Sequence, residues 1–444
     1  MSTSQAARPL AVAEPDLVAD WISAHAVPIP PAGGDREPAG GGRPGAGFER
    51  LLELAAGARI VGIGGSTYGA HEQFELTFRI IRLLVDELGF RTVATEDDWD
   101  VALPIDEYLR TGAGDLLALV DTCGAPWQVA EIYDALTWLR QWNVDHPGDQ
   151  VRFIGVGVIN TLPPVYTAIT EYVQRVAPAA AAELEQLFAV IRPVRPDHVP
   201  WFIMQVEDKE RYCEYARNTL ALLADLPVTD GAGDAEHELM LQHARQIVAF
   251  YEHYTFHLVD DGYRDQLMAD NLSWWQRHTG HRIAYWSTTA HSACAPDLFI
   301  AVPPRGVLQF AATGSHLRQA YGTGYLSVAL TYNSGTVNSC WAFPPFTRRP
   351  VETAAQPQSF SEYPLARVAG TPFAIDLRHA ATDLAPPSVQ QWLHGPAHTR
   401  IIGSIYDPSL AADEFYMTGG TLAEWFDLLI HQDTVTPTRD PRPS

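Results

Sequence analysis

The stretch Ile60–Phe74, IVGIGGSTYGAHEQF, is typical of a buried strand that ends in a glycine-rich turn and continues as a helix. Apolar Ile60, Val61 and Ile63 predict the strand, and four glycines predict the turn (Gly62, Gly64, Gly65 and Gly69). We expect the helix to carry four polar side chains: Tyr68, His71, Glu72 and Glu75. A strand that runs into a loop and a helix N-terminus marks the edge of the sheet where open α/β proteins bind ligands.

The segments that follow alternate between helical and strand-like patterns. Their order predicts an α/β protein with a mostly parallel central sheet flanked by helices. Four helical segments without intervening strands predict a helical subdomain inserted in this fold (Val165–Val176, Pro178–Ile191, Glu207–Leu226 and Ala235–Leu258). We expect four parts: an N-terminal helix and connector (1–47), a first α/β portion with the site loops (48–160), the helical subdomain (161–275) and a second α/β portion (276–444).

Composition limits the classes of partner. The chain has 444 residues, 46% of them hydrophobic, and a formal net charge of −23, so it can bury a large core but lacks the basic surface that nucleic acids or anionic membranes require. Its four cysteines are widely spaced and fit reduced, mostly buried thiols. We find no signal peptide and no apolar run long enough to span a bilayer, and therefore expect a cytoplasmic protein.

The glycine-rich turn matches no nucleotide-binding motif. A GxGxxG motif requires glycine where Thr67 stands, and GxxxxGK[ST] is absent. We therefore expect no cofactor. His253 and His257 lie one helical turn apart, but no third ligand accompanies them, so we also expect no metal ion. The partner that we expect is a small, largely apolar molecule.

Other polar residues follow predicted strands. Glu96 and Asp98 come directly after the strand Arg91–Thr95, and His291 follows the strand Arg282–Trp286. These side chains are expected at the same sheet edge as Tyr68 and His71, although a solvated acidic turn explains the carboxylates about equally well. His316, after the strand Gly306–Phe310, is a weaker candidate, and a surface histidine is the stronger interpretation there.

Several blocks in the right order resemble the erythromycin esterase family over residues 48–436. GGSTYGAHEQF is similar to the family's GExTHGxxEFF turn, and a strand ending in Glu and then DW follows it. The later blocks are RDxxMAxN, GxxL before YxS, DLR, IGxxY and FD (Arg264–Asn271, Gly314–Ser327, Asp376–Arg378, Ile402–Tyr406 and Phe426–Asp427). This resemblance implies a metal-independent hydrolase in which a histidine of the first turn activates water against a macrolactone or similar ester.

The departures from the family pattern fall on this machinery. The catalytic histidine of the family is Tyr68 here, its acidic residue is Gly65, and the first histidine of its AHxAH segment is Thr288. Glu72, Glu96 and Arg264 are retained. A phenol with an ordinary pKa of about 10 is a poor base near neutral pH, so the usual hydrolytic route loses its proton acceptor.

We therefore hypothesise a repurposed pocket for acid–base chemistry such as cyclisation, elimination or isomerisation. Tyr68 would be the acid, His71 or His291 the base, and Glu96 would orient the histidine. Further substrate contacts are expected from Glu72, Glu75, Asp98, Trp99, Arg264, Thr288 and His316. Two alternatives stay open: a retained ester hydrolase and a non-catalytic binding protein. His71 could also merely cap or pack.

Overall fold

The computed structural model describes residues 12–30, 45–227, 232–258, 260–303, 306–340, 347–368, 370, 372–381, 385–403 and 405–442. Two compact units make up the chain. The first comprises residues 1–93, 126–138 and 281–444, and the second comprises residues 94–125 and 139–280. The predicted helical part, 161–275, lies inside the second unit. Most of the predicted N-terminal tail and connector (1–11 and 31–44) lies outside the described residues.

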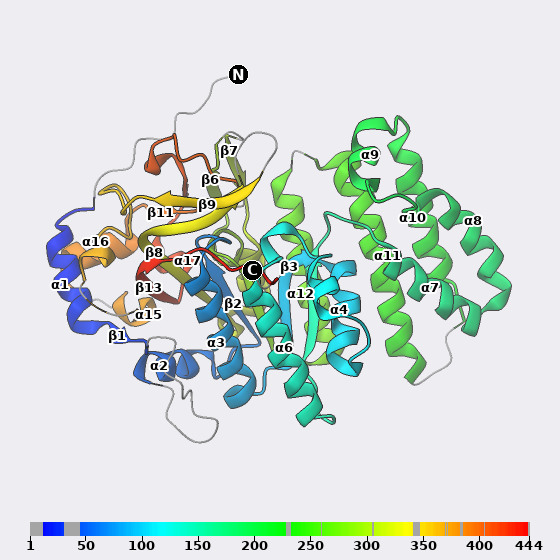
Figure 1. Cartoon of the computed structure of the whole chain (residues 1–444), viewed down its shortest axis with the longest axis horizontal. Helices are drawn as coiled ribbons and strands as arrows, with labels where there is room; N and C mark the ends of the chain where they lie inside the picture. Colours follow the sequence, from blue (N-terminus) through cyan, green and yellow to red (C-terminus); the bar gives the residue numbers. More distant parts are fainter. Residues whose placement is uncertain are drawn as a thin grey trace. The chain divides into compact units, whose positions relative to one another are not determined.

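A mixed, mostly parallel sheet forms the core of the first unit (Figure 1). Its strand order is β1-β10-β13-β8-β2-β5: Val27–Pro28, Phe373–Asp376, Leu428–Val435, Tyr325–Cys340, Ile60–Gly65 and Ile283–Thr288. The strands β13, β8, β2 and β5 run parallel, whereas β1, β10 and the flanking β9 (Arg348–Thr353) are antiparallel. Every residue of β2 and β5 is buried, as expected for parallel strands covered on both faces. The predicted α/β fold is confirmed.

The helices of the first unit are α1, α2, α3, α13, α14, α15, α16 and α17 (Pro15–His25, Ala46–Ala55, His71–Leu88, Thr289–Ser292, Thr313–Tyr321, Leu377–Ala380, Pro387–His394 and Leu422–Trp425). The helix α3 is the next element after β2, from which a five-residue turn separates it. It ends at Gly89, which adopts a left-handed conformation with φ 69° and whose N–H bonds the carbonyl of Leu84. Glycine accepts this conformation without the steric cost that a Cβ brings, which explains why the helix stops there.

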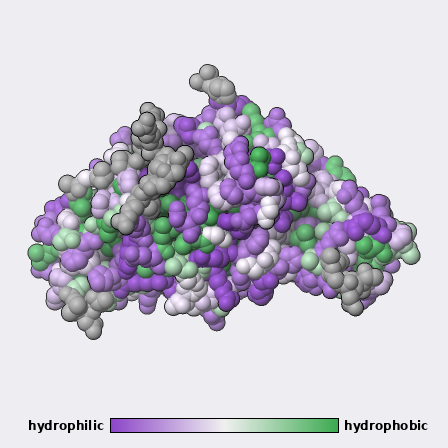
Figure 2. All heavy atoms as spheres, turned by 90° about the horizontal axis from the view of Figure 1, so that it is seen from below, coloured by the Kyte–Doolittle hydropathy of each residue, from purple (hydrophilic) through white to green (hydrophobic). Residues whose placement is uncertain are grey.

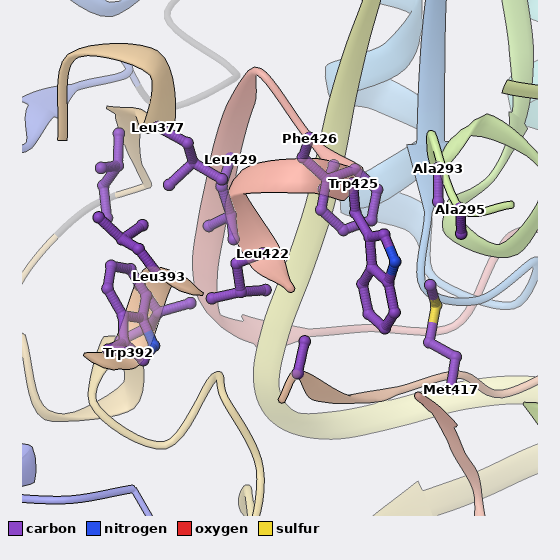
Figure 3. Close-up of a cluster of buried hydrophobic side chains, with 14 of the residues drawn as sticks. Ala293, Ala295, Leu377, Trp392, Leu393, Met417, Leu422, Trp425, Phe426 and Leu429 are labelled. Atoms are coloured by element: carbon purple, nitrogen blue, oxygen red, sulfur yellow. The ribbon is translucent and has the colours of Figure 1, made fainter. Parts of the chain in front are cut away.

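A second, antiparallel sheet in the first unit has the order β11-β12-β6-β7 (His398–Arg400, Tyr416–Thr418, Leu298–Ala301 and Val307–Phe310). The predicted strand Gly306–Phe310 is therefore real, but it belongs to this small sheet and not to the parallel one. An apolar cluster packs beside it, with Trp425 near Ala293, Ala295 and Met417 (Figure 3).

The second unit contains β4 (Arg152–Gly157) and most of β3 (Thr92–Asp98), which begins in the first unit. Its helices are α4, α5, α7, α8, α9, α10, α11 and α12 (Trp99–Thr111, Leu116–Val120, Pro163–Val176, Ala181–Ile191, His198–Gln205, Lys209–Ala224, Ala232–Phe256 and Asp261–Thr279). α10 packs against α8 and α11, and α7 packs against α8 and α11, which gives a helical bundle (Figure 1). The helix α6 (Ala130–Asp145) begins in the first unit and ends in the second.

The hydrophilic surface and the state of the cysteines agree with what the composition predicts. Figure 2 shows a face on which hydrophilic residues predominate and hydrophobic ones form small scattered groups. All four cysteines are free; three are buried and Cys340 is half-buried, which confirms the prediction of reduced, mostly buried thiols. Within the described ranges, no helix is both long enough and apolar enough to cross a bilayer.

Candidate functional site

A rigid turn, Ser66–Ala70, connects β2 to α3. The side chain of Gln73 fastens it from the first turn of α3: its Nε2 donates to Ser66 Oγ at 2.9 Å and to the Leu330 carbonyl at 3.1 Å. Its Oε1 accepts the N–H of Thr67 at 3.2 Å. Gln73 is buried, so these hydrogen bonds do not compete with water, and they fix the path of the turn.

Gly69 lies where β8 passes closest to this turn. Its carbonyl accepts the N–H of Asn338 at 2.9 Å, and a Cβ at this position would overlap the Asn338 backbone. A side chain therefore cannot be added here unless one of the two segments moves.

We expect Gly69→Ala to lower the free energy of unfolding by about 1–3 kcal/mol, because overpacking displaces the backbone. Thermal and urea unfolding of the purified variant measure the change. Gly57→Ala is the matched control, because a Cβ there meets no atom within 4 Å. Equal stabilities of the two variants would show that the close approach to Asn338 is not a constraint.

Tyr68 lies in this turn, and α3 begins only at His71. The prediction that the helix carries Tyr68 together with His71, Glu72 and Glu75 is therefore wrong for Tyr68. Its half-buried ring meets the edge of Trp127 at 5.9 Å between centroids. Trp127 also contacts Phe74 at 6.1 Å and Trp286 at 5.9 Å. These three rings are buried, so an aromatic cluster of the core lies beside the Tyr68 ring.

His71 is held by a carboxylate that the sequence analysis did not identify. Its Nδ1 lies 2.6 Å from Oε1 of Glu131, and its Nε2 lies 3.8 Å from Oε2 of Glu75. The His71 side chain is 27% exposed, whereas that of Glu131 is 4% exposed. The buried carboxylate therefore orients the ring, and Nε2 lies towards the half-exposed Glu75.

The pKa of His71 is raised and that of Glu131 is lowered. The hydrogen bond to Glu131 raises the pKa of His71 and outweighs the opposing effect of burial. Burial pushes the pKa of Glu131 upward, but hydrogen bonds from His71 and Arg439 lower it overall. The charged forms of both groups are thus favoured.

Glu72 and Glu75, both predicted to contact substrate, have different surroundings. The Glu72 carboxylate accepts the backbone N–H of Thr436 at 2.7 Å and its hydroxyl at 2.6 Å, so it links α3 to the end of the chain. Glu75 lies one helical turn after His71, as predicted, and half-exposed next to it. Substrate contact by either residue stays a prediction.

Thr288 ends β5 opposite Gly65, the last residue of β2, in parallel register. This register confirms that Thr288 lies at the same sheet edge as the Ser66–Ala70 turn. His291 follows on the short helix α13, half-buried, with its ring 6.2 Å from that of Phe310. The roles proposed for Thr288 and His291 stay predictions.

His316 lies on α14, half-buried. Because β7 belongs to the antiparallel sheet, the argument that placed His316 at the edge of the parallel sheet does not hold. Its contact with substrate stays a prediction without that support.

Glu96 and Asp98 had been expected to follow the strand. In the second unit β3 extends to Asp98, so both residues lie within the strand. Asp98 accepts the N–H of Ile159 at 2.6 Å and Nδ2 of Asn160 at 2.5 Å. Burial, and then the neighbouring charge of Asp97, raise its pKa to about 7. Glu96 is buried in the same strand. This strand end therefore concentrates buried carboxylates.

Trp99 and Arg264 are the other predicted site residues of this unit. Trp99 Nε1 donates to Nδ1 of His243 at 3.0 Å, and Trp99 and Asp100 line a small recess. Arg264 lies on α12, and its charge opposes the rise in the pKa values of Asp97 and Asp98. The functional roles of Glu96, Asp98, Trp99 and Arg264 stay predictions. Among the described residues, no group of three or more His, Cys, Asp or Glu side chains could hold a metal ion.

The sequence analysis missed Trp127, Glu131 and Arg439. Trp127 and Glu131 flank the start of α6, and Arg439 belongs to the C-terminal segment. None of them lies in a recognisable motif. The one available signal was the acidic residue in the first turn of a predicted helix, which is usually explained by the helix dipole.

Known proteins resemble this chain along most of its length. The family model for erythromycin esterase matches residues 85–435. Erythromycin esterase type II of Escherichia coli is 20% identical over 311 residues, which cover 65% of this chain and 72% of that protein.

Solved structures share the fold. A Bacillus cereus protein superposes with a TM-score of 0.81 at 24% identity, covering 96% of this chain and 99% of its own. A succinoglycan biosynthesis protein gives a TM-score of 0.76 at 20% identity, with 95% and 97% covered. A mutant of the erythromycin esterase EreC in its open conformation gives 0.66 at 18% identity, with 89% and 95% covered. With the family model matching well over half of its residues, the chain belongs to the erythromycin esterase family, which suggests an enzyme that acts on a small molecule, and an ester hydrolase in particular.

Proposed function

We propose that this protein is an acid–base enzyme that hydrolyses an ester or lactone of a small, largely apolar molecule. His71 is the proton acceptor, and Tyr68 is the proton donor. Membership of the erythromycin esterase family supports the reaction class. The aromatic cluster of Phe74, Trp127 and Trp286 beside Tyr68 supports an apolar substrate.

One observation carries this proposal: a single short segment, 127–131, contacts both residues. Trp127 packs against the ring of Tyr68, and Glu131 holds Nδ1 of His71. The family's histidine position is occupied by Tyr68, but a histidine with its own orienting carboxylate stands three residues further on. A carboxylate that binds Nδ1–H directs the basic lone pair to Nε2 and stabilises the imidazolium once the ring is protonated. The base is thus retained at a shifted position.

The chemistry balances with these two groups. His71 Nε2 takes a proton from water as the water oxygen bonds to the ester carbonyl carbon. The tetrahedral intermediate then expels the alkoxide, whose oxygen receives the proton of the Tyr68 hydroxyl. The proton on His71 returns to the tyrosinate directly or through water, which leaves one carboxylic acid, one alcohol and the original enzyme.

A panel of esters tests the reaction class. Purified protein is incubated with erythromycin A, p-nitrophenyl hexanoate and δ-decalactone, and products are followed by mass spectrometry. We expect at least one compound to be hydrolysed at a rate that depends on enzyme concentration: a lactone gains the mass of one water molecule, and the p-nitrophenyl ester splits into hexanoic acid and p-nitrophenol. Failure to open any of the three would contradict hydrolysis of these ester classes.

Tyr68 itself favours a second candidate function. A phenol in place of the family's base suits a reaction that needs a donor and a base but no activated water, such as cyclisation, elimination or isomerisation. Under this alternative, products keep the substrate's mass or lose a leaving group. Tyr68→Phe then stops turnover, and no ester is cleaved by the wild type.

A further inference from the structure

The end of the chain lies across the candidate site of the first unit. We call residues 436–439 the C-terminal strap. Its Thr436 carbonyl accepts the N–H of His71 at 2.8 Å, Pro437 forms a β-bridge with Ala70, and the N–H of Thr438 donates to the Gly69 carbonyl at 3.0 Å. Three consecutive residues of the turn and helix start are thus paired with the strap.

The strap is itself anchored to the sheet. Nδ2 of Asn338 on β8 donates to the Thr438 carbonyl at 2.6 Å, and Nη2 of Arg348 on β9 donates to Thr438 Oγ1 at 2.8 Å. Thr438 is buried. These bonds give the following residue, Arg439, a fixed position.

Arg439 meets Glu131 through both its backbone and its side chain. The Arg439 N–H lies 3.2 Å from each Glu131 oxygen, and its Nε donates to Oε1 at 3.0 Å. Oε1 is the same oxygen that Nδ1 of His71 approaches to 2.6 Å. The Arg439 carbonyl also accepts the N–H of Ala130 at 3.0 Å. Glu131 is therefore held between the strap and His71.

We propose that Arg439 is a positioning residue of this site: its backbone N–H holds the Glu131 carboxylate in place, while its Nε shares Oε1 with the His71 ring, so that its positive charge offsets part of the attraction between that carboxylate and the ring. The inference rests on the proposed role of His71 as the acid–base group. Arg439 is expected to act through Glu131 and not to touch the substrate.

The charges of Glu131 and Arg439 shift the pKa of His71 in opposite directions, which makes the inference testable. Glu131 and Glu72 favour the protonated form of His71, whereas the charge of Arg439 disfavours it. Glu75 lies next to Nε2, and Asp134 and Arg348 lie around Arg439 and Glu131. Removal of Glu131 should therefore lower the pKa of His71, and removal of Arg439 should raise it.

The test is an NMR titration of the histidine ring in the full chain, with the His71 signal assigned by its absence in His71→Asn. We expect the midpoint to fall by about 1 pH unit in Glu131→Gln and to rise by about 0.5 to 1 pH unit in Arg439→Gln. Arg439→Lys keeps the charge and should return the midpoint towards the wild-type value. Asp134→Asn removes only the outer partner of Arg439 and serves as the matched control, with no shift expected.

An unchanged or lowered midpoint in Arg439→Gln would overturn the inference, and so would a failure of Arg439→Lys to restore it. The titration uses no substrate. If it succeeds while all esters and lactones remain intact, the proposed function is wrong and the positioning role of Arg439 stands. If esters are cleaved but the midpoint of His71 does not change in Arg439→Gln, the positioning role of Arg439 is wrong and the proposed function stands. Circular dichroism melting of each variant identifies any that fail to fold, and Arg439→Lys then decides between loss of charge and loss of structure.

Discussion

Replacing His71 with asparagine is expected to lower kcat/KM for a hydrolysed ester by about 10²- to 10⁴-fold, the usual contribution of a positioned general base. Asparagine keeps a hydrogen-bond donor for Glu131 but has no group that accepts a proton near neutral pH. The fold should survive, because the side chain is 27% exposed and only its Nδ1 is paired with a buried group. Steady-state rates of ester cleavage measure the loss.

Two other histidines serve as comparisons for this result. His146→Asn is the control, because His146 is exposed, follows the end of α6 and contacts Trp142 through its Nδ1 and its stacked ring. His291→Asn tests the other histidine that the sequence proposed as the base. A large loss in His291→Asn together with full activity in His71→Asn would assign the base to His291 and contradict our account.

Replacing Glu131 with glutamine is expected to lower kcat/KM by about 10²- to 10⁴-fold, where the upper figure is the cost of the equivalent Asp→Asn exchange in Ser–His–Asp triads. Glutamine has no charge to stabilise the imidazolium, and an amide that turns its NH₂ group to Nδ1 forces the proton onto Nε2. The ring then presents a donor where a base is needed. Rates measured beside those of Asp134→Asn, which leaves the His71–Glu131 pair intact, show the effect of this carboxylate alone.

The same exchange affects stability in a defined pH range. Because the pKa of His71 is raised, its contribution to the free energy of unfolding is fully present below the ordinary pKa of 6.5. This contribution is lost as the pH rises through the raised pKa. The lowered pKa of Glu131 means that its contribution is present above the ordinary value of 4.5 and is lost as pH falls through the lowered value. Glu131→Gln should therefore cost about 1.5–3 kcal/mol near pH 6 and less once the pH has risen past the raised pKa of His71. A loss independent of pH would point to packing and not to charge.

Much of the fold could be predicted because the relevant signals are local. An apolar run followed by glycines predicted β2 and its turn. The strand Val307–Phe310 was also found, but its assignment to a sheet depends on partners far away in sequence. β7 pairs with β6, and β6 with β12, more than a hundred residues later. A pattern of side chains in one segment contains no information about which strands become neighbours.

The candidate site was less predictable for the same reason. The sequence pattern placed Tyr68 on the helix, but the helix begins at His71. The backbone N–H of His71 donates to the Thr436 carbonyl of the C-terminal strap. Glu131 lies 60 positions after His71 and Arg439 lies 308 positions after Glu131, so neither spacing forms a motif. Tyr68 and His71 were proposed as site residues because they follow β2 closely in the sequence. Their partners became visible only once the fold had brought them together.

The most direct test of the central claim is the pH dependence of kcat/KM for a cleaved ester, measured in the wild type and in Glu131→Gln. If His71 is the base and Glu131 raises its pKa, the wild-type rate rises with pH through a midpoint above the ordinary value of 6.5, and the variant's midpoint moves to lower pH. The same midpoint in both proteins would contradict the claim that the His71–Glu131 pair performs the proton transfer.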